Sequence, residues 1–536
     1  MAARLPLRGK NFHSEGWAAL MAPTARDPMA KPFFITTAID YTNAAPHVGH
    51  AYEKILADVL ARYHRLAGDR TFFLTGVDQH GQKVQQAAAA AGVSPEEFVA
   101  QTTEKFTSLW KRLDISFDAW AATTDPLHKS CVQGILQALH DKGDIYRATY
   151  RGFYSVRQEQ FLTDKERGED GEFGPEWGEV TELEEENWYF RLSQYSNWLT
   201  GFLNSHPAAV IPSFRLVELR NAAAKISNDL SISRPKARLT WGIELPFDRE
   251  CVTYVWFDAL VNYISFAGYG NPAKQEDFAS LWPALQVIGK DILVPAHGIY
   301  WLIMLHAMGF SDDQIPPLLV HGYVMMDGEK MSKSLGNIRD PNTFVDKFGA
   351  GALRYYLMRD CAVGQDMDFT DERLVQRYNG DLANSLGNLL NRSLSMAKRY
   401  RGSVLRRAES PLAGFVTEKT AAYRAQMDAH QIHSAIETTQ DIVVRCNAYV
   451  EESAPWKLAK DPAQADKLDE VLYTLAEALR VVSILIAPVL PTEADAIRTQ
   501  LAWSGPVNLS ETVWGRLPDG HQLADPVPVF PRIERE

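Results

Sequence analysis

Residues 33–77 have the sequence FFITTAIDYTNAAPHVGHAYEKILADVLARYHRLAGDRTFFLTGV, and this stretch decides the fold. It opens with a short β-branched and aromatic run, Phe33 to Ile39, which is typical of a buried strand. Apolar residues then recur at helical spacing from Val48 to Leu66, and Gly68 closes the run. A second strand-like run extends from Thr71 to Val77. Strand, long helix and strand form a βαβ unit, which requires parallel strands and a right-handed crossover.

The same pattern returns far along the chain. Leu285 to Ile288 and Leu318 to Tyr323 are short apolar runs, each followed by a polar loop and separated by a helix-like segment. The sequence therefore predicts an α/β fold with a Rossmann-like, doubly wound parallel sheet built from two distant halves. The segment between the halves has its own composition and is predicted to be an inserted domain. Within it, the acid-rich stretch from Asp164 to Glu186 suggests a solvated excursion.

Strand-like runs stop near residue 375, and long Ala- and Leu-rich helical patterns follow. This change predicts an α-helical bundle at the C-terminal end. The predicted boundaries are a disordered leader at 1–30, the first half of the sheet domain at 31–115, the insertion at 116–235, the second half at 236–325, a linker region with a lysine-containing loop at 326–375, and the helical domain at 376–536.

Composition limits the class of protein. The 536 residues exceed what one hydrophobic core serves, and the net charge of −12 argues against a surface that is basic throughout. A local basic stripe would still suffice to bind nucleic acid. No run reaches the roughly 18 uninterrupted apolar residues of a membrane span, so no membrane partner is expected. Four widely spaced cysteines indicate a reducing compartment.

The location expected from these features is the cytoplasm. Residues 1–28 carry Arg4, Arg8 and Lys10 but no apolar core, so they are not a secretory signal. If they are a transit peptide, the mitochondrial matrix is the alternative; otherwise they are a disordered tail, or Met29 is the natural first residue.

The first candidate for chemistry is His47-Val48-Gly49-His50, at the join between the first strand and the helix. Free N–H groups and a partial positive charge at a helix start favour phosphate. His47 and His50 are three residues apart, so both can donate hydrogen bonds from one helical face. Gly49 lets backbone and ligand approach closely. Taken alone, the pattern is more often two surface histidines at a helix start.

The second candidate is the loop from Asp327 to Ser334, which contains Lys330 and Lys333. Two lysines three apart in a Gly-containing loop suit the clamping of a pyrophosphate leaving group. A solvated basic loop is the usual alternative. The preceding strand favours the first interpretation, because ligands collect at the carboxyl ends of parallel strands.

Together the two elements resemble the HIGH and KMSKS signatures of class I aminoacyl-tRNA synthetases; HVGH differs by one conservative replacement and KMSKS at 330–334 is intact. TGVDQHGQKV, YVWFDALVNYISF, IGKDI and SAPWKLAK are similar to the methionyl members, and the resemblance extends from about residue 33 to 460. It implies that the insertion is a connective peptide and that the helical domain binds the anticodon. It also implies ATP, Mg²⁺, L-methionine and tRNA(Met) as substrates and partners of a methionine–tRNA ligase.

The resemblance assigns roles to residues. His47, His50, Lys330 and Lys333 would be catalytic, and these four with Gly49 and Asp291 would bind ATP. The tRNA anticodon would meet Asn388, Arg392 and Trp456, whose types suit stacking on a base and reading its edge; a packed helix end is the alternative. The methionine site would consist of Ile39, Tyr41, Asp78, Trp256, Ala259, Leu260, Tyr263 and His297.

Two departures from the family pattern bear on these roles. Many methionyl enzymes carry cysteine zinc knuckles in the connective peptide, but here Ser155 stands where a cysteine would be expected and no partner is near. Structural zinc needs about four ligands, so the chain resembles the zinc-free subgroup and no structural metal is expected. DILVPAHGIYW is one residue longer than usual before the histidine, which leaves the role of Ile292 or Leu293 open.

Three other classes of protein remain as alternatives. A leucyl, isoleucyl or valyl synthetase would need a large editing domain, for which 536 residues leave little room. A pantetheine- or nicotinamide-type adenylyltransferase shares the H-x-G-H helix start but lacks a tryptophan-bearing helical domain. A non-catalytic RNA-binding paralogue is disfavoured because both phosphate motifs are intact. A monomer is expected, because the C-terminal FPRIERE is not followed by a β-barrel tRNA-binding module.

Overall fold

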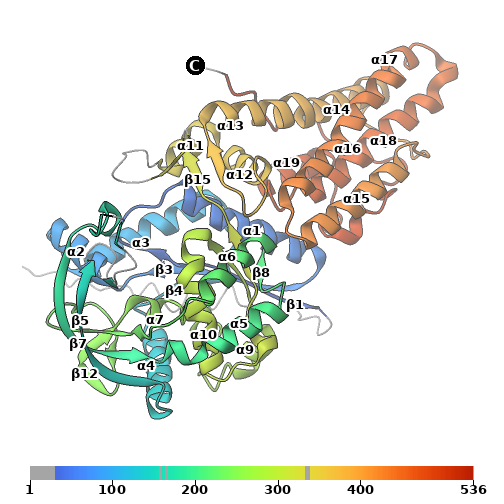
Figure 1. The fold of residues 1–536 in the computed structure, drawn as a ribbon. Helices are drawn as coiled ribbons and strands as arrows, with labels where there is room; N and C mark the ends of the chain where they lie inside the picture. The colour runs from blue at the N-terminus through green and yellow to red at the C-terminus, as the bar shows by residue number, and fades with distance from the viewer. Residues whose placement is uncertain are drawn as a thin grey trace, which may run out of the picture.

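The computed structural model describes residues 30–155, 160–162, 167–168, 170–326, 328–331 and 339–534. The leader predicted at 1–30 lies outside these residues except for Ala30. A parallel sheet with helices against it forms the centre of the molecule, and a long helical bundle extends from one side (Figure 1). The predicted fold class, a doubly wound α/β domain followed by a helical bundle, is confirmed.

The central strand of the main sheet is β1 (Pro32–Thr37). It pairs in parallel with β3 on one side and with β13 on the other, so that Ile35 faces both Phe73 and Leu285. The chain thus leaves β1 first in one direction and later in the other, and the strand order reverses between β1 and β13. Ligands of doubly wound sheets bind at this reversal, outside the carboxyl ends of the strands. The remaining pairs, also parallel, join β2 (Asp40–Tyr41) and β4 (Ala119–Ala122) to β3 (Arg70–Asp78), β14 (Leu318–His321) to β13 (Leu285–Gly289), and β8 (Val210–Ile211) to β14.

Helix α1 (Val48–Ala67) connects β1 to β3 and is buried along most of its length. One side packs on the sheet and the other on α12 (Ala350–Arg359). Buried residues therefore surround the helix instead of forming a single apolar stripe. Gly68 ends the helix with φ of 93°, a left-handed conformation that glycine adopts without strain. The predicted strand–helix–strand unit is therefore present.

The inserted segment forms a small antiparallel sheet of its own. Its long ribbon consists of β5 (Ile145–Ser155) and β7 (Val180–Phe190), flanked by β6 (Gln160–Leu162) and β9 (Leu230–Ser231). The acid-rich stretch 164–186 was expected to be a solvated loop. This prediction is wrong for residues 180–186, which belong to strand β7. Acidic side chains on the ribbon pair across to the neighbouring strand, as Glu182 does with Arg151 at 3.0 Å.

Two strands that fall inside the predicted insertion at 116–235, β4 and β8, pair with the main sheet instead. The rest of the insertion continues into a second antiparallel sheet of β10 (Ser233–Pro235), β12 (Asp248–Thr253) and β11 (Glu244–Leu245). The chain therefore returns to the sheet domain between the two parts of the insertion.

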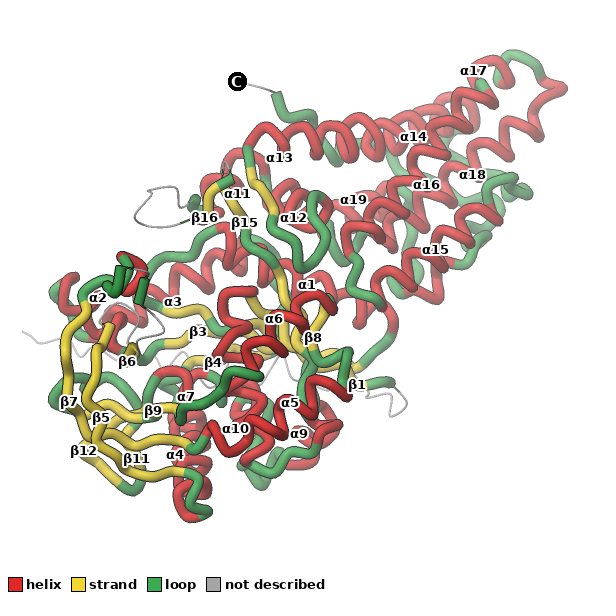
Figure 2. The backbone as a smooth tube through the Cα atoms, viewed as in Figure 1, coloured by secondary structure: helices red, strands yellow, loops and turns green. Residues whose placement is uncertain are grey.

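The last strand of the described chain is β17 (Met367–Phe369), after which only helices and loops follow (Figure 2). Tyr63 of α1 and the apolar faces of the bundle belong to one continuous hydrophobic core. The C-terminal segment packs back on the bundle, where Asn379 and Ile533 exchange two hydrogen bonds. The main helices of the bundle are α14 (Asn388–Arg401), α15 (Ala413–Asp428), α16 (Ile432–Ser453), α18 (Ala465–Leu485) and α19 (Pro491–Gln500).

Candidate functional site

Two adjoining cavities lie at the point where the strand order reverses. The smaller has a volume of about 200 Å³ and the larger of about 340 Å³. Both are lined by residues just beyond the end of β1 and by Ile292, which follows β13. The shared residues are Ala38, Ile39, Tyr41 and Ile292.

The smaller cavity is surrounded by every residue that the sequence assigned to methionine. These side chains come from β2 and the residues just before it, from the end of β3, and from two short helices, α7 (Val255–Ala259) and α8 (Asn262–Ser265), with the link between them; His297 completes the lining. The assigned residues that line it are Ile39, Tyr41, Asp78, Trp256, Ala259, Leu260, Tyr263 and His297.

Six further lining residues were not predicted. Tyr254, Val255 and Asn262 lie in the same YVWFDALVNY string that carried the prediction, so the string itself was the available signal. Lys83 and Ile292 lie in two other strings that carried the resemblance, TGVDQHGQKV and IGKDI, and Ala38 lies in the opening stretch, so the signal was present but did not single them out. Leu293, the alternative to Ile292, is fully buried in the core. The backbone there is a π-helix, Leu293–Trp301, with an extended residue inside it, an irregularity that can accommodate the additional residue.

His297 forms the polar end of the smaller cavity. Its Nδ1 lies 3.0 Å from the carbonyl oxygen of Ile292, so this nitrogen carries the proton. Nε2 therefore accepts a hydrogen bond from the hydroxyl of Tyr263, at 2.7 Å. Burial lowers the pKa of His297 to about 4. The ring is neutral at physiological pH and suits an uncharged ligand side chain.

A buried histidine–aspartate–histidine chain supports the wall formed by α7. Asp258 lies 2.6 Å from Nδ1 of His80 and 2.8 Å from Nε2 of His128, and all three side chains are buried. Burial alone would raise the pKa of Asp258, but the two histidines lower it to about 2. His80 also donates its backbone N–H to Asp78, at 3.3 Å. The chain thus links α7 to the end of β3, where Asp78 lines the cavity.

The two histidines at the start of α1 cap the helix with their side chains. The backbone N–H of Gly49 donates to Nδ1 of His47, and the backbone N–H of His47 donates to Nδ1 of His50, both at 3.1 Å. A nitrogen that accepts cannot carry the proton in the neutral ring, so Nε2 is the N–H donor of both neutral rings. A Cβ on Gly49 would lie 2.9 Å from the ring of His47, so this arrangement requires glycine.

His50 is neutral in this position. Burial of the ring, with smaller contributions from His47 and Lys54, lowers its pKa well below 6.5. It lines the larger cavity together with His47 and Gly49. Both rings and the helix start therefore line the larger cavity, and their role in binding phosphate stays a prediction.

A charged network that the sequence did not predict lies behind these histidines. Lys54 is fully buried, and its three donors go to the carbonyl of Ala38 at 2.9 Å, to Asp40 at 2.6 Å and to Glu53 at 2.9 Å. Glu53 in turn binds His321 at 3.1 Å. Asp40, Glu53 and His321 line the larger cavity. Charged residues at core positions of α1, one turn after His50, were the signal available in the sequence.

Of the other predicted ATP-binding residues, the structure describes the side chain of Asp291 but not those of Lys330 and Lys333. Asp291 lines the larger cavity just beyond β13, and a Cβ on Gly289 would approach its carboxylate to 2.7 Å. Met331 also lines this cavity, which brings the start of the lysine loop to it. Lys333 lies outside the described residues, and for Lys330 the structure describes only the backbone, in β16 (Glu329–Lys330).

The residues predicted to contact tRNA lie in the bundle. Asn388 is exposed at the start of α14, and Arg392 one turn later binds Glu451 of α16 at 2.7 Å. Trp456 lies in α17 (Pro455–Leu458), partly exposed and partly packed on the bundle core. Figure 1 shows α17 at the end of the bundle that is farthest from the sheet.

A metal ion in a protein is usually held by three or more histidine, cysteine or acidic side chains. No such group occurs among the residues that the structure describes. Ser155 is buried and donates its hydroxyl to the carbonyl of Trp177. The expected absence of structural zinc stays a prediction. No helix in the described part of the chain is long and apolar enough to cross a bilayer.

Comparison with known proteins identifies the family. The model for class I tRNA synthetases (M) matches residues 33–170 and 177–394, and the model for the anticodon binding domain of methionyl tRNA ligase matches residues 401–536. The methionine–tRNA ligase of Deinococcus radiodurans is 43% identical over 96% of this chain and 76% of its own length. That of Lactococcus lactis is 38% identical over 94% of this chain and 78% of its own length.

Solved structures agree with the sequence comparison. Mycobacterium tuberculosis methionyl-tRNA synthetase in complex with methionyl-adenylate superposes with a TM-score of 0.87 at 37% identity, over 94% of this chain and 100% of the other. The free form of that enzyme gives a TM-score of 0.83 at 33% identity, over 95% of this chain. Sheet, insertion and bundle are therefore shared, and the chain belongs to the methionyl-tRNA synthetases, the methionine–tRNA ligases of class I.

Proposed function

We propose that this protein activates L-methionine with ATP to methionyl-adenylate and pyrophosphate, and then transfers the methionyl group to the 3′-terminal ribose of tRNA(Met), releasing AMP. The observation that carries the proposal is the pair of adjoining cavities at the strand reversal: one is apolar with a neutral histidine, and the other is lined by the histidine-capped helix start. The names of the relatives agree with this function.

In the first step, the methionine carboxylate attacks the α-phosphorus of ATP. Its reference pKa is near 3.5, so it is ionised at neutral pH and no general base is required. The protein must position the reactants and stabilise charge that develops on the phosphate. Nε2–H of His47 and of His50 would donate to phosphate oxygens, and Lys330 and Lys333 would neutralise the departing pyrophosphate.

Selection of methionine would depend on shape and on contacts to sulfur. A thioether carries no charge and accepts hydrogen bonds only weakly, and it packs well against aromatic rings. Trp256 and Tyr263 supply such rings, and each lies edge-on to His297, with ring centres 6.3 and 5.7 Å from the histidine ring. Asp78 would bind the α-ammonium group at the mouth of this pocket.

Magnesium fits the larger cavity as an ion carried mainly by ATP. Mg²⁺ in such sites binds phosphate oxygens and one or two carboxylates rather than a complete protein cage. Asp291 lines the cavity, and the buried Oδ2 of Asp40 has no hydrogen-bond partner among the residues that the structure describes. The ion would supply positive charge to the pyrophosphate as it leaves.

In the second step, the ribose hydroxyl of the tRNA terminus attacks the adenylate; in class I enzymes this is the 2′-OH. Asn388, Arg392 and Trp456 would meet the anticodon at the other end of the molecule. The domain order, with β4 and β8 assigned to the sheet domain, a monomeric state and a cytoplasmic location are parts of the same proposal.

The test is amino-acid-dependent exchange of pyrophosphate into ATP, measured with each of the twenty amino acids. Only methionine is expected to support exchange at low concentration. Exchange with leucine, isoleucine or valine instead would assign the chain to a sister synthetase. Exchange with none would leave only tRNA binding and would overturn the proposal.

A further inference from the structure

Helix α1 extends from the larger cavity to the bundle. Its 20 residues span about 30 Å at 1.5 Å per residue. His50 lines the cavity at one end, and near the other end Tyr63 donates its hydroxyl to Asp428 of α15 at 2.6 Å. The same rigid element therefore contacts both the candidate ATP site and the candidate tRNA-binding domain.

Asp58, in the middle of α1, is completely buried and has four hydrogen-bond donors around it. Oδ1 accepts from the backbone N–H and the hydroxyl of Ser116, at 2.7 and 2.6 Å. Oδ2 accepts from Arg62 at 2.8 Å and from Arg354 at 2.7 Å. Burial alone would raise its pKa, but Arg354, Arg62 and Ser116 hold the pKa of Asp58 below its usual value. The carboxylate of Asp58 is therefore charged, and each of its oxygens accepts two hydrogen bonds.

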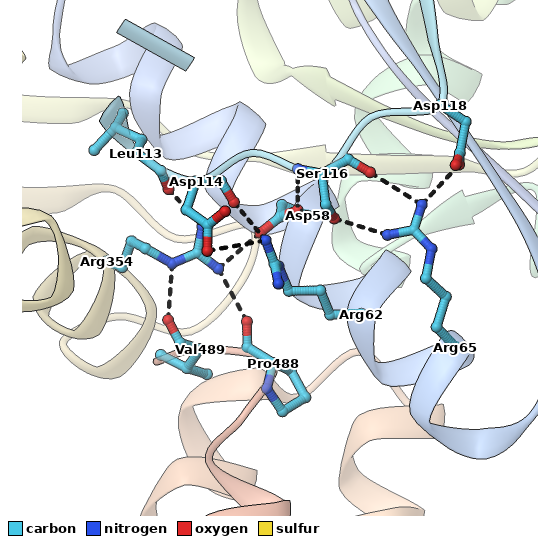
Figure 3. Close-up of polar contacts among 10 residues, drawn as sticks. All are labelled: Asp58, Arg62, Arg65, Leu113, Asp114, Ser116, Asp118, Arg354, Pro488 and Val489. Atoms are coloured by element: carbon cyan, nitrogen blue, oxygen red, sulfur yellow. Dashed lines mark hydrogen bonds and ion pairs between the residues drawn. The ribbon is translucent and has the colours of Figure 1, made fainter. Parts of the chain in front are cut away.

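Arg354 joins three parts of the molecule through one guanidinium group (Figure 3). The side chain lies on α12, which follows the lysine loop in the chain, and only 1% of its surface is exposed. It donates to Asp58 of α1, and to the carbonyl of Leu113 in the sheet domain at 3.0 Å. It also donates to the carbonyls of Pro488 and Val489 in the bundle, at 3.0 and 2.8 Å.

Pro488 and Val489 form the turn between α18 and α19. The opposite end of α18 packs against α17, which carries Trp456. Arg354 thus lies between two helices: α18, about 30 Å long, extends from it toward Trp456, and the first half of α1 extends about 12 Å from Asp58 to His50. We call Arg354 and its contacts to Asp58, Leu113, Pro488 and Val489 the joint. Beside it, the backbone of α12 lies so close to α19 that a Cβ on Gly351 would overlap the carboxylate of Glu493.

The joint is specific to arginine. A guanidinium presents donors in a rigid planar fork, whereas the ammonium of lysine is a point charge with three donors on a flexible stem. Lysine at 354 could keep the ion pair with Asp58, but it could not hold Leu113, Pro488 and Val489 in the same plane. The geometry of the contacts, more than their charge, fixes the bundle relative to α1.

We propose that Arg354 is a positioning residue for transfer to tRNA: it holds the bundle at the one orientation in which a tRNA bound at Trp456 reaches the adenylate. The inference rests on the proposed function. It predicts that a variant with weakened contacts at Arg354 still forms methionyl-adenylate in the sheet domain and still binds the anticodon in the bundle. Transfer of methionine to tRNA, which requires both domains, should fail.

The test compares Arg354→Lys with Arg62→Lys in the full chain. Arg62 binds the same oxygen of Asp58 and the carbonyl of Asp114. It lines a cavity that Pro488 also lines, but among the described residues it makes no hydrogen bond or ion pair with the bundle, so it is the matched control. Three quantities are measured: methionine-dependent pyrophosphate exchange, affinity for an isolated anticodon stem–loop, and the single-turnover rate of transfer from preformed methionyl-adenylate to tRNA. Arg354→Lys should keep the first two within twofold and lower transfer at least tenfold, whereas Arg62→Lys should leave all three within twofold.

A second variant, Asp58→Asn with Arg354→Met, removes both fully buried charges together, for use if Arg354→Lys does not fold. Arg62 loses Asp58 but keeps its ion pair with Asp114 at 3.3 Å, so no unpaired buried charge remains. This second variant should show the same separation of transfer from exchange. If transfer is retained in a folded variant, or if exchange and stem–loop binding fall in proportion to transfer, Arg354 only stabilises the fold and the inference is overturned. Failure of the wild type to exchange pyrophosphate with methionine would instead reject the proposed function.

Discussion

Two histidine rings at the start of α1 show how far a sequence motif determines a site. The motif fixed the positions of His47 and His50 but not their roles in the helix cap, because a side chain that accepts from its own backbone leaves no sign in the sequence. Likewise, the eight side chains assigned to methionine surround one cavity because continuous strings carry them. Lys83 and Ile292 also line that cavity and lie in the strings TGVDQHGQKV and IGKDI, but a shared string does not show which of its side chains face a ligand.

At this scale we expect His50→Ala to lower the rate of adenylation by about 10²- to 10³-fold, the usual effect of losing one donor to a charged transition state. Affinity for methionine should change little, because His50 lines the larger cavity and not the smaller one. His50→Gln should retain more activity, since its amide can still donate. Pyrophosphate exchange and equilibrium binding of methionine measure the two effects; lost affinity with an unchanged rate would contradict this role.

The neutral state of His297 gives a prediction about pH. Its pKa is lowered from 6.5 to about 4 by burial. Affinity for methionine should therefore be constant between pH 6 and 8. Below about pH 6.5 the unfolded chain binds a proton at this position that the folded chain does not bind until about pH 4, so the free energy of unfolding should decrease as pH falls through that window. An affinity that titrates near pH 6.5 would show that the ring is charged in the site.

At the scale of elements, length and periodicity decided what could be predicted. The strands β1 and β3 and the helix α1 were predicted because each is long enough to show a period or a continuous apolar run. The strands β2 and β8 have two residues each and join the sheet only through pairing with distant strands. Strand β7 was not predicted. It carries so many acidic residues that the alternation of exposed and covered side chains, which is typical of a strand with one exposed face, is not visible in its sequence.

The cap of α1 can be tested with a pair of glycines. In Gly49→Ala the new methyl group would collide with the ring of His47 and displace the cap, so exchange should fall at least tenfold. The matched control is Gly134→Ala in α4 (Pro126–Asp141), where a Cβ meets no atom within 4 Å. It should leave exchange unchanged and add up to about 1 kcal/mol of stability, as alanine does in a helix. Equal activity of the two variants would mean that the cap has no part in catalysis.

At the scale of the whole molecule, the order of the domains follows from the sequence, but their contacts do not. A change from strand-like to helical patterns near residue 375 indicated the bundle. That the bundle shares one core with α1, and that Arg354 bonds to both, depends on residues separated by more than a hundred positions. Such contacts have no local pattern, so the sequence predicted two separate halves and not the joint between them.

The separation of the halves predicts the effect of Trp456→Ala. Methionine-dependent pyrophosphate exchange should remain intact, because α17, which carries Trp456, lies at the end of the bundle farthest from the sheet (Figure 1). Charging of tRNA should fall, since one base–aromatic stack contributes about 1–3 kcal/mol, or roughly five- to a hundredfold in affinity. An anticodon substitution in the tRNA should reproduce the loss, and the two changes together should cost less than their sum. Full additivity with a lowered Tm would place Trp456 in the core instead.

The central claim is that this protein joins methionine to tRNA(Met). The most direct measurement incubates the purified full chain with ATP, Mg²⁺, unfractionated tRNA and each labelled amino acid, and then identifies which tRNA carries label. The account predicts label from methionine alone, attached to tRNA(Met) through its 3′-terminal ribose. Label from another amino acid, methionine on a different tRNA, or methionyl-adenylate that charges no tRNA would contradict it.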